Sequence, residues 1–71
     1  MKGGDFLNKK RKWLEYKRGE LGLTQLEVSE MLGMKQPQYS RYETGESEPN
    51  AINKAKIARV LNFDINEWRR G

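Results

Sequence analysis

The apolar residues of this chain recur at the three- and four-residue spacing of α-helices, and glycines interrupt the pattern at short intervals. No stretch of four or more residues alternates apolar and polar side chains as a half-buried strand does. Gly22, Gly33 and Gly45 each follow a helical segment, where a left-handed residue often ends a helix. The pattern predicts an all-α fold in one domain covering residues 1–71, a compact five-helix bundle with helices over about residues 6–20, 24–32, 36–44, 51–61 and 65–70.

Capping residues precede three of these segments. Thr24 and Glu27 have the spacing of a capping box, in which each side chain accepts a hydrogen bond from the other residue's backbone N–H. Asp64 and Glu67 repeat that spacing before the last segment, and Asn50 is placed to cap the segment at 51–61. These signals support the helix starts independently of the apolar pattern.

The 71-residue chain contains neither cysteine nor histidine. Disulfides, redox thiols and Cys-ligated zinc are therefore excluded, and the commonest general base and metal ligand is missing. We expect no metal, no cofactor and no enzymatic activity, because no reacting group has a partner to activate it. No apolar run approaches the ~18 residues of a membrane span and no signal-peptide core is present, so the expectation is a soluble, cytoplasmic protein without a membrane partner.

The net charge of +4 is distributed unevenly. Residues 1–18 carry seven cations and two anions, residues 19–50 two cations and six anions, and residues 51–71 five cations and two anions. Basic ends around an acidic middle suggest a polyanion that approaches particular surfaces of the protein. Solubility alone would also account for this pattern, so charge does not decide between the two.

The second and third predicted helices are each about two turns long, and Gly33, Met34 and Lys35 join them. A turn of this length sets two helices at about 90–120° and leaves the outer face of the second one open. This is the geometry of a DNA-binding helix-turn-helix. Because many small helical proteins contain tight corners, the spacing alone does not distinguish a DNA-binding protein from other helical proteins.

The residues themselves resemble the Xre/Cro/phage-repressor helix-turn-helix family over most of the chain, from about Leu14 to Trp68. The residues that carry the resemblance are Arg18, Gly22-Leu23-Thr24-Gln25, Val28, Leu32-Gly33-Met34, Tyr39-Ser40-Arg41-Tyr42-Glu43-Thr44-Gly45, Pro49, Ile57-Ala58, Leu61 and Phe63. The resemblance implies a lambda-repressor-like DNA-binding domain that acts as a homodimer on a two-fold symmetric operator in double-stranded DNA, with its third helix in the major groove.

The resemblance also implies where DNA is contacted. The base-contacting positions would be Gln36, Pro37, Gln38 and Arg41. The phosphate-contacting positions would be Thr24, Gln25, Lys35, Ser40 and Thr44. The chemistry fits, because a glutamine amide matches adenine N6 and N7 and an arginine fork matches guanine O6 and N7. The alternative is an ordinary polar face in contact with solvent.

Other residues are better interpreted as scaffold. Arg18 and Glu43 fall where the family has a charged pair that links the first helix to the end of the third. Tyr39 and Tyr42 are three residues apart and are expected to face the core, with a groove role for Tyr39 as the alternative.

The sequence departs from the family pattern at several positions. Pro37 replaces a residue that often touches a base, and Lys35 stands where Ser or Thr would cap the third helix, although a lysine can pair with a phosphate. Glu46 and Glu48 lie in a loop that is basic in many relatives, so this loop either faces away from DNA or weakens binding. Lys17 occupies a usually apolar position, which implies a thinner core or a side chain whose stem packs while its amine reaches solvent.

Two functions remain open at this point. The favoured one is a sequence-specific DNA-binding transcriptional regulator, with repression favoured over activation. The alternative is an antitoxin or a protein-interaction adaptor that uses the same fold with weak or no DNA recognition. Leu26 and Met31 lie at typically polar positions beside Glu27 and Glu30, so a protein such as RNA polymerase or a toxin could bind this surface.

Overall fold

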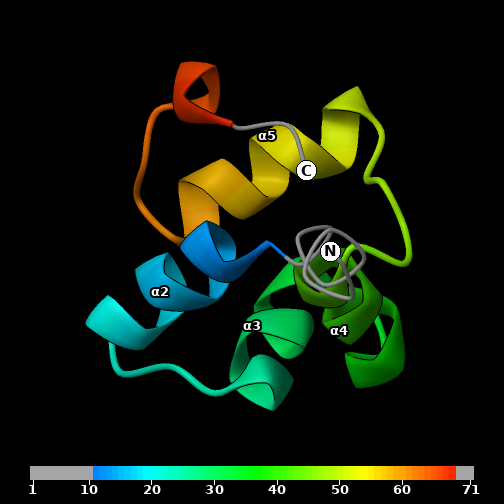
Figure 1. The fold of residues 1–71 in the computed structure, drawn as a ribbon. Helices are drawn as coiled ribbons and strands as arrows, with labels where there is room; N and C mark the ends of the chain where they lie inside the picture. Colours follow the sequence, from blue (N-terminus) through cyan, green and yellow to red (C-terminus); the bar gives the residue numbers. More distant parts are fainter. Residues whose placement is uncertain (1–10, 69–71) are drawn as a thin grey trace, which may run out of the picture.

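The computed structural model describes residues 11–68. In chain order these residues form α2 (Lys12–Glu20), α3 (Gln25–Leu32), α4 (Gln36–Thr44), α5 (Ala51–Val60) and the one-turn 3-10 helix η1 (Ile65–Glu67), as Figure 1 shows. The described part of the chain contains no strand, which confirms the all-α prediction. Helix α3 packs against both α4 and α5, α2 packs against α4, and η1 packs against α5.

The predicted five-helix count is not supported, because the segment expected at 65–70 is a single 3-10 turn in its described part. The expected capping box is absent there: the Asp64 side chain accepts from the N–H of Asn66. The Glu67 carboxylate lies 3.1 Å from the Lys17 Nζ instead of folding back on the turn. Residues 69 and 70 lie outside the described part of the chain.

Arg11 does not belong to the helix predicted over about residues 6–20. Arg11 has a non-helical backbone (φ −94°, ψ 71°), and α2 starts at Lys12. The reason is tertiary, because the Arg11 N–H donates to the Glu43 carbonyl oxygen at 2.7 Å instead of to a preceding helical turn. The expected residues 6–10 of this helix lie outside the described part.

The four described α-helices contribute to one apolar core. Its buried members are Leu14, Val28, Leu32, Tyr39, Tyr42, Ile57 and Leu61. Trp13 packs edge-on against Phe63 and Trp68, with ring centroids 5.8 and 5.0 Å apart. The Lys17 Nζ lies 5.0 Å from the centre of the Phe63 ring and pairs with Glu67. The Lys17 stem therefore packs while its amine reaches an exposed carboxylate, which is the second of the two arrangements expected for this lysine.

Local signals fix both ends of α3. The Glu27 N–H donates to Thr24 Oγ1 at 3.0 Å and the Thr24 N–H donates to Glu27 Oε1 at 2.8 Å, so the predicted capping box is present. At the other end Gly33 adopts a left-handed conformation (φ 73°), and the next N–H, from Met34, donates to the Ser29 carbonyl oxygen at 2.9 Å. The short turn therefore sets the direction of α4.

Gly33 and Gly19 should respond oppositely to alanine. A Cβ would meet no atom within 4 Å at either position, so only the backbone conformation matters. Gly33→Ala should lower the free energy of unfolding by about 1 kcal/mol because of its positive φ. Gly19→Ala, within α2, should raise it by about 0.5–1 kcal/mol. Urea unfolding of the two variants checks both signs, and two shifts of the same sign would contradict this account.

Candidate nucleic-acid interface

Helix α4 has one buried face and one open face. Tyr39, Tyr42 and Glu43 are buried, and their three- and four-residue spacing places them on one side of the helix. The fully buried ring of Tyr39 rules out the groove role considered for it, and burial raises the pKa of its hydroxyl. Pro37 and Arg41, on the opposite side, are exposed.

The structure brings the predicted base-contacting residues together on this helix. Gln36, Pro37, Gln38 and Arg41 are all exposed, in the first two turns of α4. Pro37 lies in the first turn, where its missing N–H costs no hydrogen bond. Their side chains are therefore accessible to a partner outside the molecule, as contact with DNA bases requires.

The predicted phosphate-contacting residues lie around that surface. Lys35 is exposed at the N-cap of α4 and makes no side-chain capping bond, as its chemistry implies. Ser40 and Thr44 are half-buried, and the Thr44 hydroxyl donates to the Arg41 carbonyl oxygen at 3.2 Å. Thr24 and Gln25 lie at the start of α3, where Thr24 is the N-cap.

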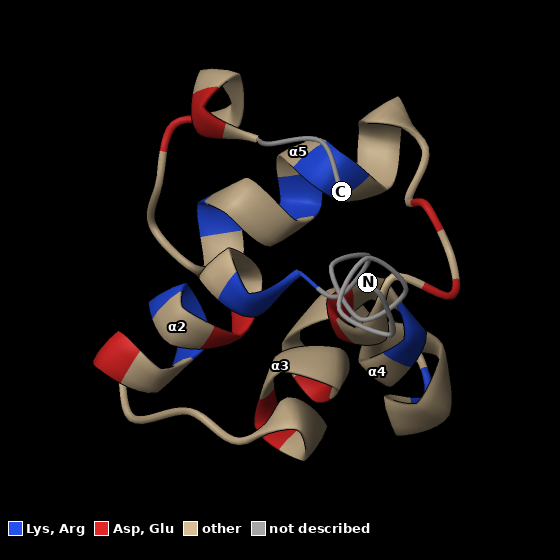
Figure 2. Ribbon diagram, viewed as in Figure 1, with Lys and Arg blue, Asp and Glu red and all other residues tan. Residues whose placement is uncertain are grey.

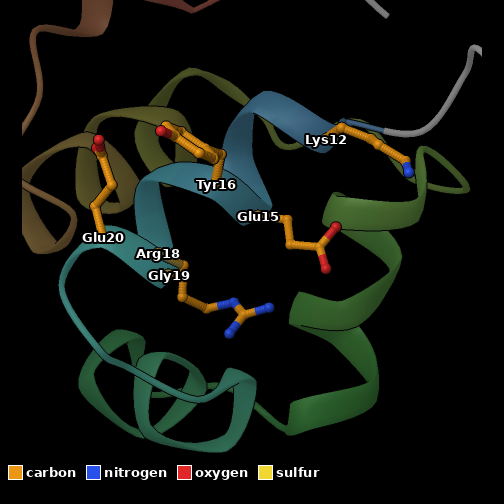
Figure 3. A pocket seen from close by; sticks show the side chains of 6 residues that line it. All are labelled: Lys12, Glu15, Tyr16, Arg18, Gly19 and Glu20. Atoms are coloured by element: carbon orange, nitrogen blue, oxygen red, sulfur yellow. The ribbon is translucent and has the colours of Figure 1, made fainter.

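Two depressions on the described surface lie away from the open face of α4. A wide one of about 620 Å³ lies along α2, and a smaller one is lined by Leu23 and α3 side chains. Figure 3 shows the α2 depression, from whose floor Arg18 reaches away toward α4. Because Arg18 is hydrogen-bonded to Glu43 on α4, its guanidinium does not face this depression as a ligand-binding group would. We therefore assign no small-molecule site here.

An ion pair joins α2 to the end of α4. Arg18 Nε donates to Glu43 Oε2 at 2.7 Å, and Arg18 Nη2 donates to Glu43 Oε1 at 3.2 Å. The Glu43 side chain is 5% exposed and the Arg18 side chain 15% exposed. The hydrogen bond to Glu43 is the main reason why the pKa of Arg18 is raised. A third donor bond, from Arg18 Nη1 to the Leu23 carbonyl oxygen at 2.8 Å, ties the loop before α3 to the same pair.

The Glu43 carboxylate also orients a side chain that reaches the start of α4. Gln25 Nε2 donates to Glu43 Oε1 at 2.8 Å. Since a carboxylate only accepts hydrogen bonds, the Gln25 amide nitrogen must face Glu43. Gln25 Oε1 then accepts from Gln36 Nε2 at 3.4 Å. Gln25 is thus more than a candidate phosphate ligand, because it connects the buried ion pair to the first residue of α4.

Arg11 is a structural residue that the sequence did not reveal. It falls within the helix predicted over about residues 6–20, but its side chain is only 4% exposed. Its Nη1 donates to the carbonyl oxygens of Tyr42 and Ser47, and its Nη2 pairs with Glu48. Arg11 therefore fixes the loop after α4. No helical spacing links residues 31 to 37 positions apart, so no local signal could have indicated these contacts.

The two acidic residues of this loop have different environments. Glu48 pairs with Arg11 and with Lys54 Nζ at 2.8 Å, so two cations compensate its charge. Glu46 is exposed, and its Oε1 lies 3.9 Å from Arg41 Nε. Of these two residues, only Glu46 is paired with a residue on the open face of α4.

Glu48 should contribute a small, pH-dependent part of the stability. The hydrogen bond from Lys54 is the first reason why its pKa lies below the ordinary value of 4.5. A carboxyl with a lower pKa in the folded state stabilises the protein above its unfolded pKa, and this contribution is lost as pH falls through the folded pKa. Glu48→Gln should cost less than about 1 kcal/mol at pH 7, because solvent screens this half-exposed group. Urea unfolding at pH 7 and pH 3 checks this, since the difference from the parent should be smaller at pH 3 than at pH 7.

Helices α3 and α4 differ in the charge and in the apolar character of their exposed surfaces. As Figure 2 shows, the charged residues within α3 are acidic, whereas Arg41 and the N-cap Lys35 bring positive charge to α4. Leu26 and Met31 on α3 are 51% and 59% exposed. A shallow depression beside them is lined by Leu23, Glu27, Glu30 and Met31. This acidic, partly apolar side of α3 differs chemically from the α4 surface.

Two short helices, a three-residue turn with a left-handed glycine, and an open polar face on the second helix are now established. A family model described as Helix-turn-helix matches residues 14–68. The chain belongs to the helix-turn-helix family. This confirms the resemblance seen in the sequence. An uncharacterized HTH-type transcriptional regulator of Bacillus subtilis (strain 168), YqaF, is 39% identical over 54 residues, which are 76% of this chain and 71% of that protein. No solved structure gives a significant match.

Two further findings concern only residues 11–68. None of the helices there combines the length and the apolar character needed to cross a lipid bilayer. The same residues contain no group of three or more acidic side chains arranged to hold a metal ion.

Proposed function

We propose that this helix-turn-helix protein is a sequence-specific regulator of transcription that binds double-stranded DNA and reads the major groove with α4. One observation carries the proposal: Gln36, Gln38 and Arg41 are exposed on a helix whose opposite face is buried in the core. The relative described as a transcriptional regulator supports it.

The side chains of α4 suit base edges in the major groove. Arg41 offers two N–H donors to guanine O6 and N7. Gln36 keeps its amide oxygen and one N–H for adenine N6 and N7 while it donates its other N–H to Gln25. Gln38 can make the same kind of contact, and Pro37 offers only apolar contact with a thymine methyl group.

Phosphates on either side would fix the register of the protein on the duplex. Lys35 supplies a positive charge, and Gln25 at the first turn of α3 has an N–H group beyond the one that it donates to Glu43. Thr24, Ser40 and Thr44 supply hydroxyl groups at the borders of the surface.

A single α4 reads only a few base pairs, so we propose a homodimer on a two-fold symmetric operator. Its half-sites would be centred one helical turn, about 34 Å, apart. Repression is the favoured outcome, because occupying a promoter needs no further contact. The protein would act in the cytoplasm and would have no enzymatic activity.

Selection of bound sequences from random duplexes tests this proposal. We expect a two-fold symmetric consensus, and binding of it should weaken with salt with a log–log slope near −5 if the dimer neutralises about six phosphates. Recovery of no consensus, or binding that does not change with salt, would overturn the proposal.

A protein partner is the second candidate, and the exposed Leu26 and Met31 beside Glu27 and Glu30 favour it. A toxin held by this chain as an antitoxin, or RNA polymerase, would meet an acidic surface with an apolar centre. Stable co-purification with a protein that α3 substitutions abolish, together with no affinity for DNA, would favour this candidate over a DNA-binding regulator.

A further inference from the structure

Glu46 lies next to the arginine that is proposed to read a base. Its Oε1 is 3.9 Å from Arg41 Nε, and the two side chains are 69% and 63% exposed. No other ion pair among the described residues includes Arg41. The contact joins the second turn of α4 to the loop that follows Gly45.

The backbone around Glu46 is held by several bonds. The Glu46 N–H donates to Thr44 Oγ1 at 3.4 Å, and the Ser47 N–H donates to the Arg41 carbonyl oxygen at 3.2 Å. Arg11 Nη1 in turn donates to the Ser47 carbonyl oxygen at 3.0 Å. The buried Arg11 thus anchors the loop from the core side, and the Glu46 side chain starts from a fixed position beside Arg41.

The Glu46 carboxylate lies on the Nε side of the Arg41 guanidinium, so the two terminal nitrogens remain available to bind a base. A guanidinium has five N–H donors in one plane, and a guanine needs two of them for O6 and N7. With Glu46 on the Nε side, the two terminal nitrogens of Arg41 can both point away from the helix. The carboxylate therefore restricts how Arg41 turns without blocking its contact with guanine.

The same carboxylate opposes binding to DNA that lacks the right base. On such DNA the nearest acceptor for Arg41 is a phosphate, which every sequence offers. Glu46 competes with that phosphate for the guanidinium and repels it directly. Bases carry no net charge, so the contact with guanine does not suffer this repulsion to the same degree.

We propose that Glu46 is a specificity-determining residue, which holds Arg41 for base recognition and lowers the affinity for unrelated sequences. This inference rests on the proposed function, since it requires α4 to read DNA. Because exposed ion pairs contribute little, each effect should amount to about a two- to five-fold change in affinity per α4 helix.

Glu46→Gln tests the inference by removing the charge and keeping the shape. The dissociation constants are measured for the duplex recovered by selection and for a shuffled duplex of equal length. Glu20→Gln is the matched control, because Glu20 is exposed at the end of α2, on the far side from α4 in Figure 3. Relative to this control, Glu46→Gln should bind the shuffled duplex several-fold more tightly and reduce the ratio of specific to non-specific affinity.

A double variant separates the two effects. In an Arg41→Ala background, Glu46→Gln should still raise the affinity for shuffled DNA, but it should no longer lower the preference for the guanine that Arg41 contacts. Thermal unfolding confirms that the variants are folded, and their exposed positions favour this. If Glu46→Gln behaves like Glu20→Gln while the parent protein prefers the selected duplex, this inference is wrong and the proposed function stands. If the parent protein prefers no sequence, both are wrong.

Discussion

Replacing Glu43 with alanine is expected to lower the free energy of unfolding by about 3 kcal/mol, because the guanidinium of Arg18, whose side chain is largely buried, loses its partner. The Gln25 amide loses its acceptor as well. For a domain of this size such a loss corresponds to a fall in Tm of roughly 12–24 °C. Thermal and urea unfolding, followed by circular dichroism, measure both quantities.

Two further variants separate the ion pair from other causes. Glu30→Ala removes an exposed carboxylate from α3 and should change stability by about 0.5 kcal/mol or less. The double variant Arg18→Met/Glu43→Met should lose less stability than Glu43→Met alone, because no charge is left without a partner. A Glu43→Ala protein as stable as Glu30→Ala would show that the pair does not connect α2 to α4 energetically.

Arg41→Ala is expected to weaken binding of the selected duplex by about 5- to 150-fold per half-site, which corresponds to the 1–3 kcal/mol of a bidentate contact with guanine. The preference for one base position in each half-site should disappear at the same time. The fold should be unaffected, since the Arg41 side chain is 63% exposed. Calorimetric titration against the selected duplex and its single-base variants measures these effects.

Lys35→Ala is the informative comparison for Arg41→Ala. Lys35 is also an exposed cation beside α4, but it is proposed to contact a phosphate. Its loss should weaken binding to all sequences alike and reduce the salt slope by about one per contact. If both variants weaken all sequences equally, Arg41 is a phosphate ligand and the assignment of base contacts to this part of α4 is wrong.

Local signals were enough to predict most of the helical segments. The Thr24 and Glu27 capping box, the Asn50 cap and the left-handed Gly33 involve residues within a few positions of one another, and all three are present. Their energies depend on spacing along the chain, which a sequence displays directly. Gly22 and Gly45 adopt the expected left-handed conformation for the same reason.

The errors arose where a distant partner changed the outcome. Asp64 and Glu67 have the spacing of a capping box, but Glu67 pairs with Lys17, fifty positions earlier, and a 3-10 turn forms. Arg11 looked like part of a basic helix and is instead buried against Tyr42 and the loop after it. Neither contact follows from the spacing of neighbouring residues.

For the candidate interface, too, the sequence predicted some features and only the fold revealed others. Helical periodicity separates the buried Tyr39 and Tyr42 from the exposed Arg41, and the positions of the base contacts were inferred from the family resemblance. The bond from Gln25 to Glu43 spans eighteen positions, and only the fold reveals it. The same holds for Glu46, which the sequence marked as a repulsive charge and the structure places beside the side chain it can orient.

Methylation protection on the selected duplex tests the central claim most directly, namely that the open face of α4 enters the major groove. Dimethyl sulfate reports guanine N7 in the major groove and adenine N3 in the minor groove. The account predicts protection of guanine N7 in two clusters whose centres lie one helical turn apart, about 34 Å. Protection confined to adenine N3, or unchanged reactivity of every guanine in the bound duplex, would contradict it.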